Sequence, residues 1–135
     1  MTEKVKWQKQ AEKWMEKAQR NFSDAQILYR EGGFGDTICF LCQQTVEKSL
    51  KGLLVYQGQD IKDEFKIHDL VKLADYCKKH LPNIVRLKQE IVMLNRYYIE
   101  TRYPVEIPQE YSKVEIQKAL NIAEKVLHSV ENFLS

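Results

Sequence analysis

The stretch from Lys6 to Glu31 reads KWQKQAEKWMEKAQRNFSDAQILYRE and contains neither proline nor glycine. Its apolar residues recur every three or four positions over about seven turns, which is the pattern of one face of an amphipathic helix. These residues are Trp7, Ala11, Trp14, Met15, Ala18, Phe22, Ala25, Leu28 and Tyr29. Lys17 falls on the opposite face with two other lysines. Gly32 and Gly33 follow, and glycine there ends a helix in a left-handed cap, so we predict a long first helix.

A second amphipathic helix is predicted from about Thr37 to Gln57, with Asp36 as its N-cap and Gly58 at its end. Gly52 lies in its interior, where a glycine costs about 1 kcal/mol relative to alanine. We expect the close approach of a neighbouring helix to compensate for this cost.

Three further helices complete the pattern. A short one is predicted from about Asp69 to Lys79, capped by His68 or Asp69, and a longer one from about Pro82 to Thr101. The last begins after Ser112, which forms a capping box with Glu115. The sequence therefore predicts one all-α domain over residues 1–135, an antiparallel up-and-down helical bundle of about five helices, four long and one short.

The overall charge is nearly balanced, with 21 basic and 19 acidic residues and a net charge of +2. The charge is too balanced to imply nucleic-acid binding by bulk electrostatics, and it leaves a local basic patch as an open alternative. Three cysteines suit free thiols in a reducing compartment. No apolar run reaches transmembrane length, and the first ten residues lack the apolar core of a signal peptide. We expect a cytoplasmic protein without membrane association.

Two pairs of residues have the spacing of zinc half-sites: Cys39 with Cys42, and Cys77 with His80. Both pairs fall inside predicted helices, whereas structural zinc pairs usually lie on turns. Cys42 and Cys77 also fall on apolar faces, where a free cysteine acts as a small hydrophobic residue. We therefore expect no metal and no cofactor.

The second helix carries a dense polar set, Gln43, Gln44, Glu47, Lys48 and Lys51. Such residues at i+3 and i+4 spacing form either a solvated face with Glu47–Lys51 pairing or one wall of a polar cleft for an anionic ligand.

The most unusual stretch is RYYIETRYP, residues 96–104, where two arginines and three tyrosines crowd a helix end. Arg102 continues the line of the apolar stripe. An inward-pointing Arg102 would need a carboxylate partner, for which Glu47 is a candidate. Arginine with tyrosine also suits the recognition of phosphates and bases, and both alternatives remain open.

Three segments together resemble the HEPN family (higher eukaryotes and prokaryotes nucleotide-binding domain): QQTVEKSLKG at 43–52, KIHDL at 66–70 and YIETRYP at 98–104. The resemblance implies a helical bundle that is commonly a homodimer. It also implies nucleotide binding and, often, a minimal nucleotidyltransferase partner in a toxin–antitoxin-type pair. Many members of the family are metal-independent ribonucleases that use an arginine, a polar residue, a short spacer and then a histidine.

This chain departs from the ribonuclease pattern, because no histidine follows Arg96 or Arg102 at the required distance. The chain therefore lacks an obvious general acid or base for the ribose 2′-hydroxyl. A binding site remains, in which the arginines contact phosphate, tyrosines stack on a base and α-helical lysines supply positive potential. Its candidate residues are Arg96, Arg102, Tyr98, Tyr103, Lys48, Lys51 and Gln44.

Three hypotheses follow. The first is a module that binds a nucleotide, RNA or a nucleotidyltransferase protein. The second is a metal-independent ribonuclease with an altered centre made of Arg96, Arg102 and His68, although His68 also suits a capping or packing role. The third is a purely structural dimerisation protein.

Overall fold

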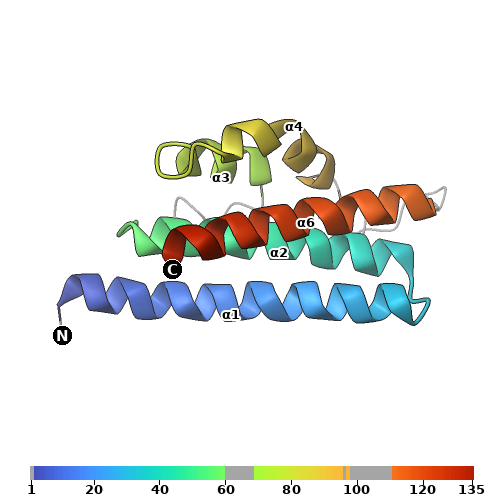
Figure 1. The fold of residues 1–135 in the computed structure, drawn as a ribbon, viewed down its shortest axis with the longest axis horizontal. Helices are drawn as coiled ribbons and strands as arrows, with labels where there is room; N and C mark the ends of the chain where they lie inside the picture. Colours follow the sequence, from blue (N-terminus) through green and yellow to red (C-terminus); the bar gives the residue numbers. More distant parts are fainter. Residues whose placement is uncertain (1, 60–68, 96, 98–110) are drawn as a thin grey trace.

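The computed structural model describes residues 2–59, 69–95, 97 and 111–135. Within these ranges every regular element is an α-helix (Figure 1). The helices are α1 (Glu3–Arg30), α2 (Gly35–Tyr56), α3 (Leu70–Cys77), α4 (Ile84–Asn95) and α6 (Lys113–Leu134). Figure 1 shows α1 on one side, α2 and α6 in the middle, and the α3–α4 pair on the other side. The predicted all-α bundle with a short third helix is confirmed.

Contacts at the helix ends define their directions. The α1 helix runs antiparallel to α2, whereas α2 and α6 run in the same direction (Figure 1). At their C-terminal ends, the rings of Tyr56 and Phe133 meet edge to face with centroids 6.4 Å apart. At their N-terminal ends, the backbone of Gly35 lies against Ile116. The shorter helices α3 and α4 pair through Asp75 and Lys88, whose charged atoms are 2.9 Å apart.

The turn after α1 has the geometry that its glycines predict. Gly32 has a φ of +76°, and its N–H donates to the carbonyl of Tyr29. The N–H of Gly33 donates to the carbonyl of Leu28 at 2.6 Å, which completes a Schellman motif.

The N-cap expected at Asp36 is wrong. The α2 helix begins at Gly35, with Phe34 in the cap position. Asp36 lies in the first turn, where its carboxylate accepts a hydrogen bond from the N–H of Thr37 at 2.8 Å. The negative charge is favourable there because it faces the positive end of the helix dipole.

Other helix starts agree with the sequence. Asp69 is the N-cap of α3 and accepts hydrogen bonds from two backbone N–H groups of the first turn. The Ser112 hydroxyl accepts a hydrogen bond from the N–H of Glu115 at 3.1 Å. The α4 helix begins at Ile84, slightly later than predicted, and Pro82 lies in the preceding turn. The predicted end of that helix at Thr101 lies outside the described residues.

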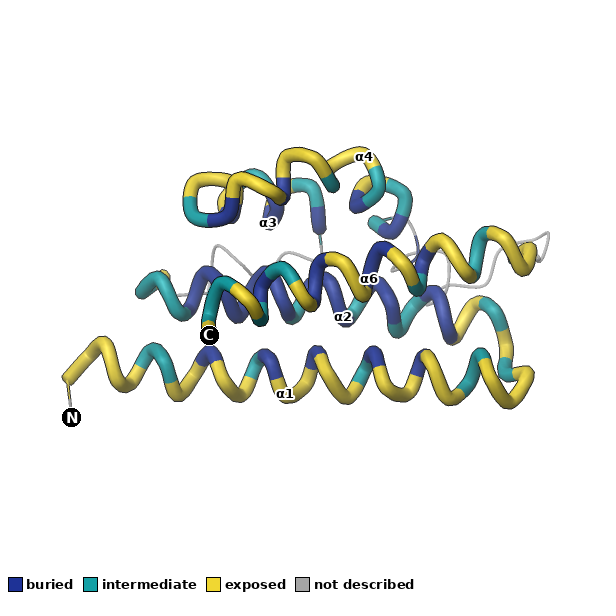
Figure 2. The backbone as a smooth tube through the Cα atoms, in the orientation of Figure 1, coloured by how far each residue is buried: buried dark blue, intermediate teal, exposed yellow. Residues whose placement is uncertain are grey.

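The α2 helix is the centre of the fold, because it contacts α1, α6, α3 and α4. Figure 2 shows buried residues along its whole length, whereas α1 is buried only along the side that faces α2. Gly52 permits a close approach to α1, since an added Cβ would lie 2.8 Å from the sulfur of Met15. The close approach expected at this glycine is therefore confirmed. None of the helices described has the length and apolarity needed to cross a bilayer.

Candidate functional site

A row of polar side chains lies inside the bundle on α2. Gln43, Glu47 and Lys51 follow one another at intervals of four residues, and their exposed fractions are 0%, 3% and 6%. The interpretation of these three as a solvated face is therefore wrong. The physical reason is that α2 has helices on several sides, so that these three polar side chains are buried together with the apolar face.

The side chains of the polar row contact one another and the adjacent Gln44 on the same helix. The Lys51 ammonium lies 3.4 Å from the Glu47 carboxylate, which confirms the predicted pairing but places it in a buried environment. The side-chain amide of Gln44 donates to the Gln43 side-chain oxygen at 2.6 Å. Gln44 and Lys48 are half-buried and lie at the edge of the row.

The edge of the row continues onto α1. The Lys48 ammonium donates a hydrogen bond to the Asn21 side-chain oxygen at 2.5 Å. Two other ammonium groups lie near the ring of Trp14, that of Lys51 at 5.6 Å from the centroid and that of Lys17 at 6.0 Å. Burial lowers the pKa of Lys48 below its usual value; nearby Lys17 and Lys51 lower it further, whereas Glu47 opposes the shift.

A second polar contact fixes the start of α3 to the end of α4. The Asn95 side-chain oxygen accepts a hydrogen bond from the N–H of Leu70 at 2.7 Å, and its amide nitrogen donates to the Asp69 carboxylate at 3.2 Å. One side chain thus extends the cap of α3. Asp69 and Asn95 are also the chain neighbours of two candidate site residues, His68 and Arg96.

Replacing Asn95 by alanine is expected to lower the free energy of unfolding by about 1–3 kcal/mol, because the buried N–H of Leu70 loses its acceptor. Urea denaturation of the purified variant measures this loss. The neighbouring variant Gln89→Ala, on the exposed side of α4, is the control and should change stability by less than about 0.5 kcal/mol. Equal stability of the two variants would show that Asn95 does not hold the helices together.

Tyr97, two residues after Asn95 in the chain, is fully buried. Its hydroxyl donates to the Glu115 carboxylate at 2.8 Å, and its ring packs edge to face on Tyr111 with centroids 5.4 Å apart. Arg96, one of the candidate arginines, directly precedes Tyr97 in the chain.

The predicted site residues divide into two groups. Lys48, Lys51 and Gln44 lie on α2, where Lys51 belongs to the polar row and the other two lie at its edge. Five others lie outside the described residues: Arg96, Arg102, Tyr98, Tyr103 and His68. The pairing of Arg102 with Glu47 therefore stays a prediction.

Sequence reasoning missed the contribution of α1. Lys17 is exposed and Trp14 is half-buried, which agrees with the periodicity, but the periodicity does not predict that both lie beside the lysines of α2. One feature of the sequence could have indicated this contribution. Trp14 and Asn21 are seven residues apart and therefore lie on the same side of the helix, and that side is neither uniformly charged nor uniformly apolar.

The four candidate zinc ligands do not form a site. All four are described, and no three His, Cys, Asp or Glu side chains gather as metal ligands in the described residues. Cys39 and Cys42 are buried in α2, and the Cys77 thiol donates to the Leu50 carbonyl at 3.4 Å. Burial raises the pKa of Cys42, and it raises that of Cys77 to about 12, so both thiols are protonated at neutral pH and suit packing rather than metal binding.

A pocket of about 460 Å³ lies between α1 and the C-terminal ends of α2 and α6. Ala11, Met15 and Tyr56 contribute apolar surface, and Glu12 and Glu131 are among its polar lining residues. Negative charge disfavours a phosphate ligand. The basic edge of the polar row therefore suits an anion better than this pocket does.

The fold and the site define an α-helical bundle with a buried polar row on its central helix. The sequence matches the HEPN domain family over residues 11–133, and the chain belongs to this family. It is 26% identical over 140 residues to the protein named "Putative toxin MJ1304" from Methanocaldococcus jannaschii, a match that covers 93% of this chain and 89% of the relative.

Two solved structures have the same fold. The crystal structure of TT1696 from Thermus thermophilus superposes with a TM-score of 0.78 at 31% identity, over 91% of this chain and 97% of that one. The structure of ST0689, an archaeal HEPN homologue, gives a TM-score of 0.70 at 27% identity, over 93% and 98% of the two chains.

Proposed function

We propose that this HEPN-family chain is a non-catalytic binding module that takes a nucleotide, or a nucleotidyltransferase protein, at the polar face of α2. We further propose that it is a cytoplasmic homodimer and the helical half of a toxin–antitoxin-type pair. The name of the methanogen relative, which describes a toxin, supports this context. The observation that carries the proposal is the buried row of Gln43, Glu47 and Lys51.

The buried polar row supports a binding function, because stability alone does not favour burying these polar and charged groups. Removing charged groups from water costs several kcal/mol per ion, and well-packed apolar residues often replace a buried ion pair without loss. Departures from a simple apolar core are expected chiefly at functional sites. Gln44 and Lys48, which are half-buried beside the row, are the positions at which a ligand could reach it.

The roles of the remaining residues follow from their chemistry. Arg96 and Arg102 are proposed to hold phosphate oxygens by paired N–H donors, and Tyr98 or Tyr103 to stack on a base. Lys48 adds positive potential at the edge of the row.

A ribonuclease centre made of Arg96, Arg102 and His68 is the second candidate. One observation favours it: the hydrogen bond between Asp69 and Asn95 joins the chain neighbours of His68 and Arg96. Cleavage of RNA in the presence of a chelator, lost in His68→Ala, would support this centre. Cleavage that is equal in His68→Ala and the parent would exclude His68 from it.

Thermal unfolding with ATP, GTP, CTP, UTP and a short RNA tests the binding proposal. A ligand at 100 times its dissociation constant stabilises the folded state by about 2.7 kcal/mol. For a chain of this size we expect the midpoint to rise by roughly 8–16 °C, since each kcal/mol shifts it by about 3–6 °C. The shift should disappear in Arg96→Ala and Arg102→Ala.

The exposed Lys78, in the turn after α3, provides the control, and Lys78→Ala should keep the full shift. An Arg102→Ala variant that is unfolded without ligand would identify Arg102 as a core residue, and Arg96→Ala would then decide the site. The absence of a shift with every nucleotide and with RNA would reject nucleotide binding and leave the protein partner to be tested by co-purification.

A further inference from the structure

The two flanks of α1 differ in chemistry. Its buried residues form a single stripe that faces α2, from Ala11 to Ala25. One flank carries Glu12 and Gln19 toward α6, where Gln19 donates to Glu131. The other flank carries Trp14, Lys17 and Asn21 along the lysines of α2. The positive and aromatic side chains are therefore gathered on one side of the α1–α2 seam.

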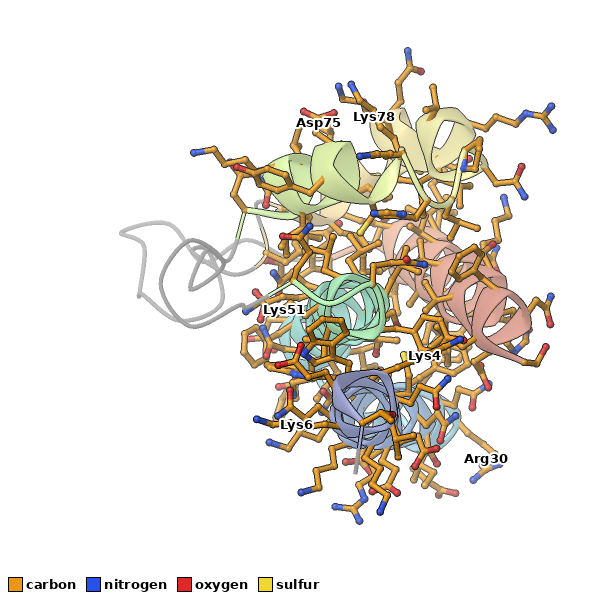
Figure 3. All side chains as sticks on the ribbon, turned by 90° about the vertical axis from the view of Figure 1, so that its left-hand side faces the viewer. Lys4, Lys6, Arg30, Lys51, Asp75 and Lys78 are labelled. Atoms are coloured by element: carbon orange, nitrogen blue, oxygen red, sulfur yellow. The ribbon has the colours of Figure 1, made fainter. Side chains whose placement is uncertain are left out.

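This flank is an organised cluster rather than a set of independent surface lysines. Lys17 and Lys51 both lie within 6.0 Å of the Trp14 ring, and Asn21 holds the ammonium of Lys48. Figure 3 shows Lys51 on the side of α2 that faces away from α6. Trp14, Asn21 and Lys48 are half-buried and Lys17 is exposed, so the cluster remains open to a ligand along its outer edge.

The cluster places several lysine ammonium groups close together where they are partly buried. Burial lowers the pKa of Lys48, Glu47 opposes this shift, and Lys17 and Lys51 each lower the pKa further, because the three ammonium groups lie close enough to repel one another. An anion placed between them would replace this repulsion by charge-assisted hydrogen bonds. The Trp14 ring alongside offers a flat face to a base or ribose.

We propose that Trp14, Lys17, Asn21 and Lys48 form a phosphate-binding subsite on the α1–α2 seam, which takes the phosphate groups of a nucleotide or of an RNA strand. This inference rests on the proposed function and extends its site from α2 onto α1. Lys17 and Lys48 donate to phosphate oxygens, Asn21 positions the Lys48 ammonium, and Trp14 borders the same ligand.

Intrinsic fluorescence gives a direct test, because the chain has only two tryptophans. A Trp7→Phe background leaves Trp14 as the sole reporter and keeps an aromatic ring against Gly58, which Trp7 contacts. Titration with inorganic tripolyphosphate is expected to give a saturable change in Trp14 emission. In this background, Lys17→Ala and Lys48→Met should each weaken binding about tenfold or more, since each removes a hydrogen bond to a charged group. Lys78→Ala removes the same charge elsewhere and should leave the affinity within about twofold.

Parallel titrations with ATP and with a single-stranded oligonucleotide distinguish the sources of the phosphate. If RNA is the ligand, the oligonucleotide binds more tightly than tripolyphosphate, and each lysine variant reduces the salt slope of log affinity by about one. If a nucleotide is the ligand, ATP binds more tightly than the oligonucleotide and the same variants weaken it.

The subsite is overturned if Lys17→Ala and Lys48→Met both bind all three probes as tightly as Lys78→Ala does. The proposed function would then still stand if the nucleotide-induced shift of the unfolding midpoint remains sensitive to Arg96→Ala. Conversely, the lysine variants could lose tripolyphosphate binding while no nucleotide or RNA stabilises the parent protein. That result would support the phosphate subsite and reject nucleotide binding as the function.

Discussion

Replacing Glu47 by alanine is expected to lower the free energy of unfolding by about 3–5 kcal/mol. The Glu47 and Lys51 side chains are only 4% and 7% exposed, so the small values measured for surface ion pairs do not apply. The variant leaves the Lys51 ammonium in the bundle without the carboxylate that lies 3.4 Å away. Urea denaturation measures the loss, and the thermal midpoint should fall by more than about 10 °C.

A double variant separates the missing partner from the missing side chain. Glu47→Leu with Lys51→Met removes both charges and keeps much of the volume, so it is expected to be more stable than Glu47→Ala by at least about 2 kcal/mol. The double variant should also weaken the nucleotide response, because it replaces two of the three residues of the buried polar row. A cost below about 1 kcal/mol for Glu47→Ala would mean that the pair is solvated and that burial on α2 does not single out this site.

The local elements of the fold could be predicted from the sequence because their causes are local. The stripe of α1 requires a helix of that length, and Gly32 and Gly33 end it whatever the rest of the chain does. The cap at Ser112 depends on residues three positions apart. The prediction failed at Asp36, because an acidic residue is favourable both as an N-cap and in the first turn, and the sequence does not separate the two.

The surroundings of α2 could not be predicted in the same way. A Glu and a Lys four residues apart form a pair on any helix, whether that pair is solvated or covered. The periodicity identifies the apolar face but not the number of neighbouring helices, and it is those neighbours that bury Gln43 and Glu47. The sequence thus predicts a polar set on α2, while the burial of that set and its contact with Trp14 depend on tertiary packing.

Tyr97 shows a related limit. Positions three and four residues after Leu94 both lie near its face of a helix, so the sequence allows either Tyr97 or Tyr98 to continue the apolar stripe. The structure places Tyr97 in the core. Its neighbours there include Tyr111 and Glu115, which are more than a dozen residues away in the chain.

Replacing Tyr97 by alanine is therefore expected to cost about 3–5 kcal/mol of unfolding free energy, the usual range for removing a buried aromatic side chain. The loss has two parts, the cavity beside Tyr111 and the hydrogen bond to Glu115. Tyr97→Phe removes only the hydroxyl and should cost about 1–2 kcal/mol, since that bond is made to a carboxylate. Urea denaturation of the two variants measures both parts.

Tyr76→Ala is the matched control, because Tyr76 lies on α3 with 44% of its surface exposed and should cost less than about 1 kcal/mol. If Tyr97→Ala is no less stable than this control, Tyr97 is not a core residue in solution. The comparison also bears on function, because Tyr97 directly follows Arg96. The loss of the Tyr97 contacts is expected to weaken the nucleotide response more in Tyr97→Ala than in Tyr97→Phe, measured below the unfolding midpoint of each variant. Equal responses would mean that the candidate arginines are positioned by other contacts.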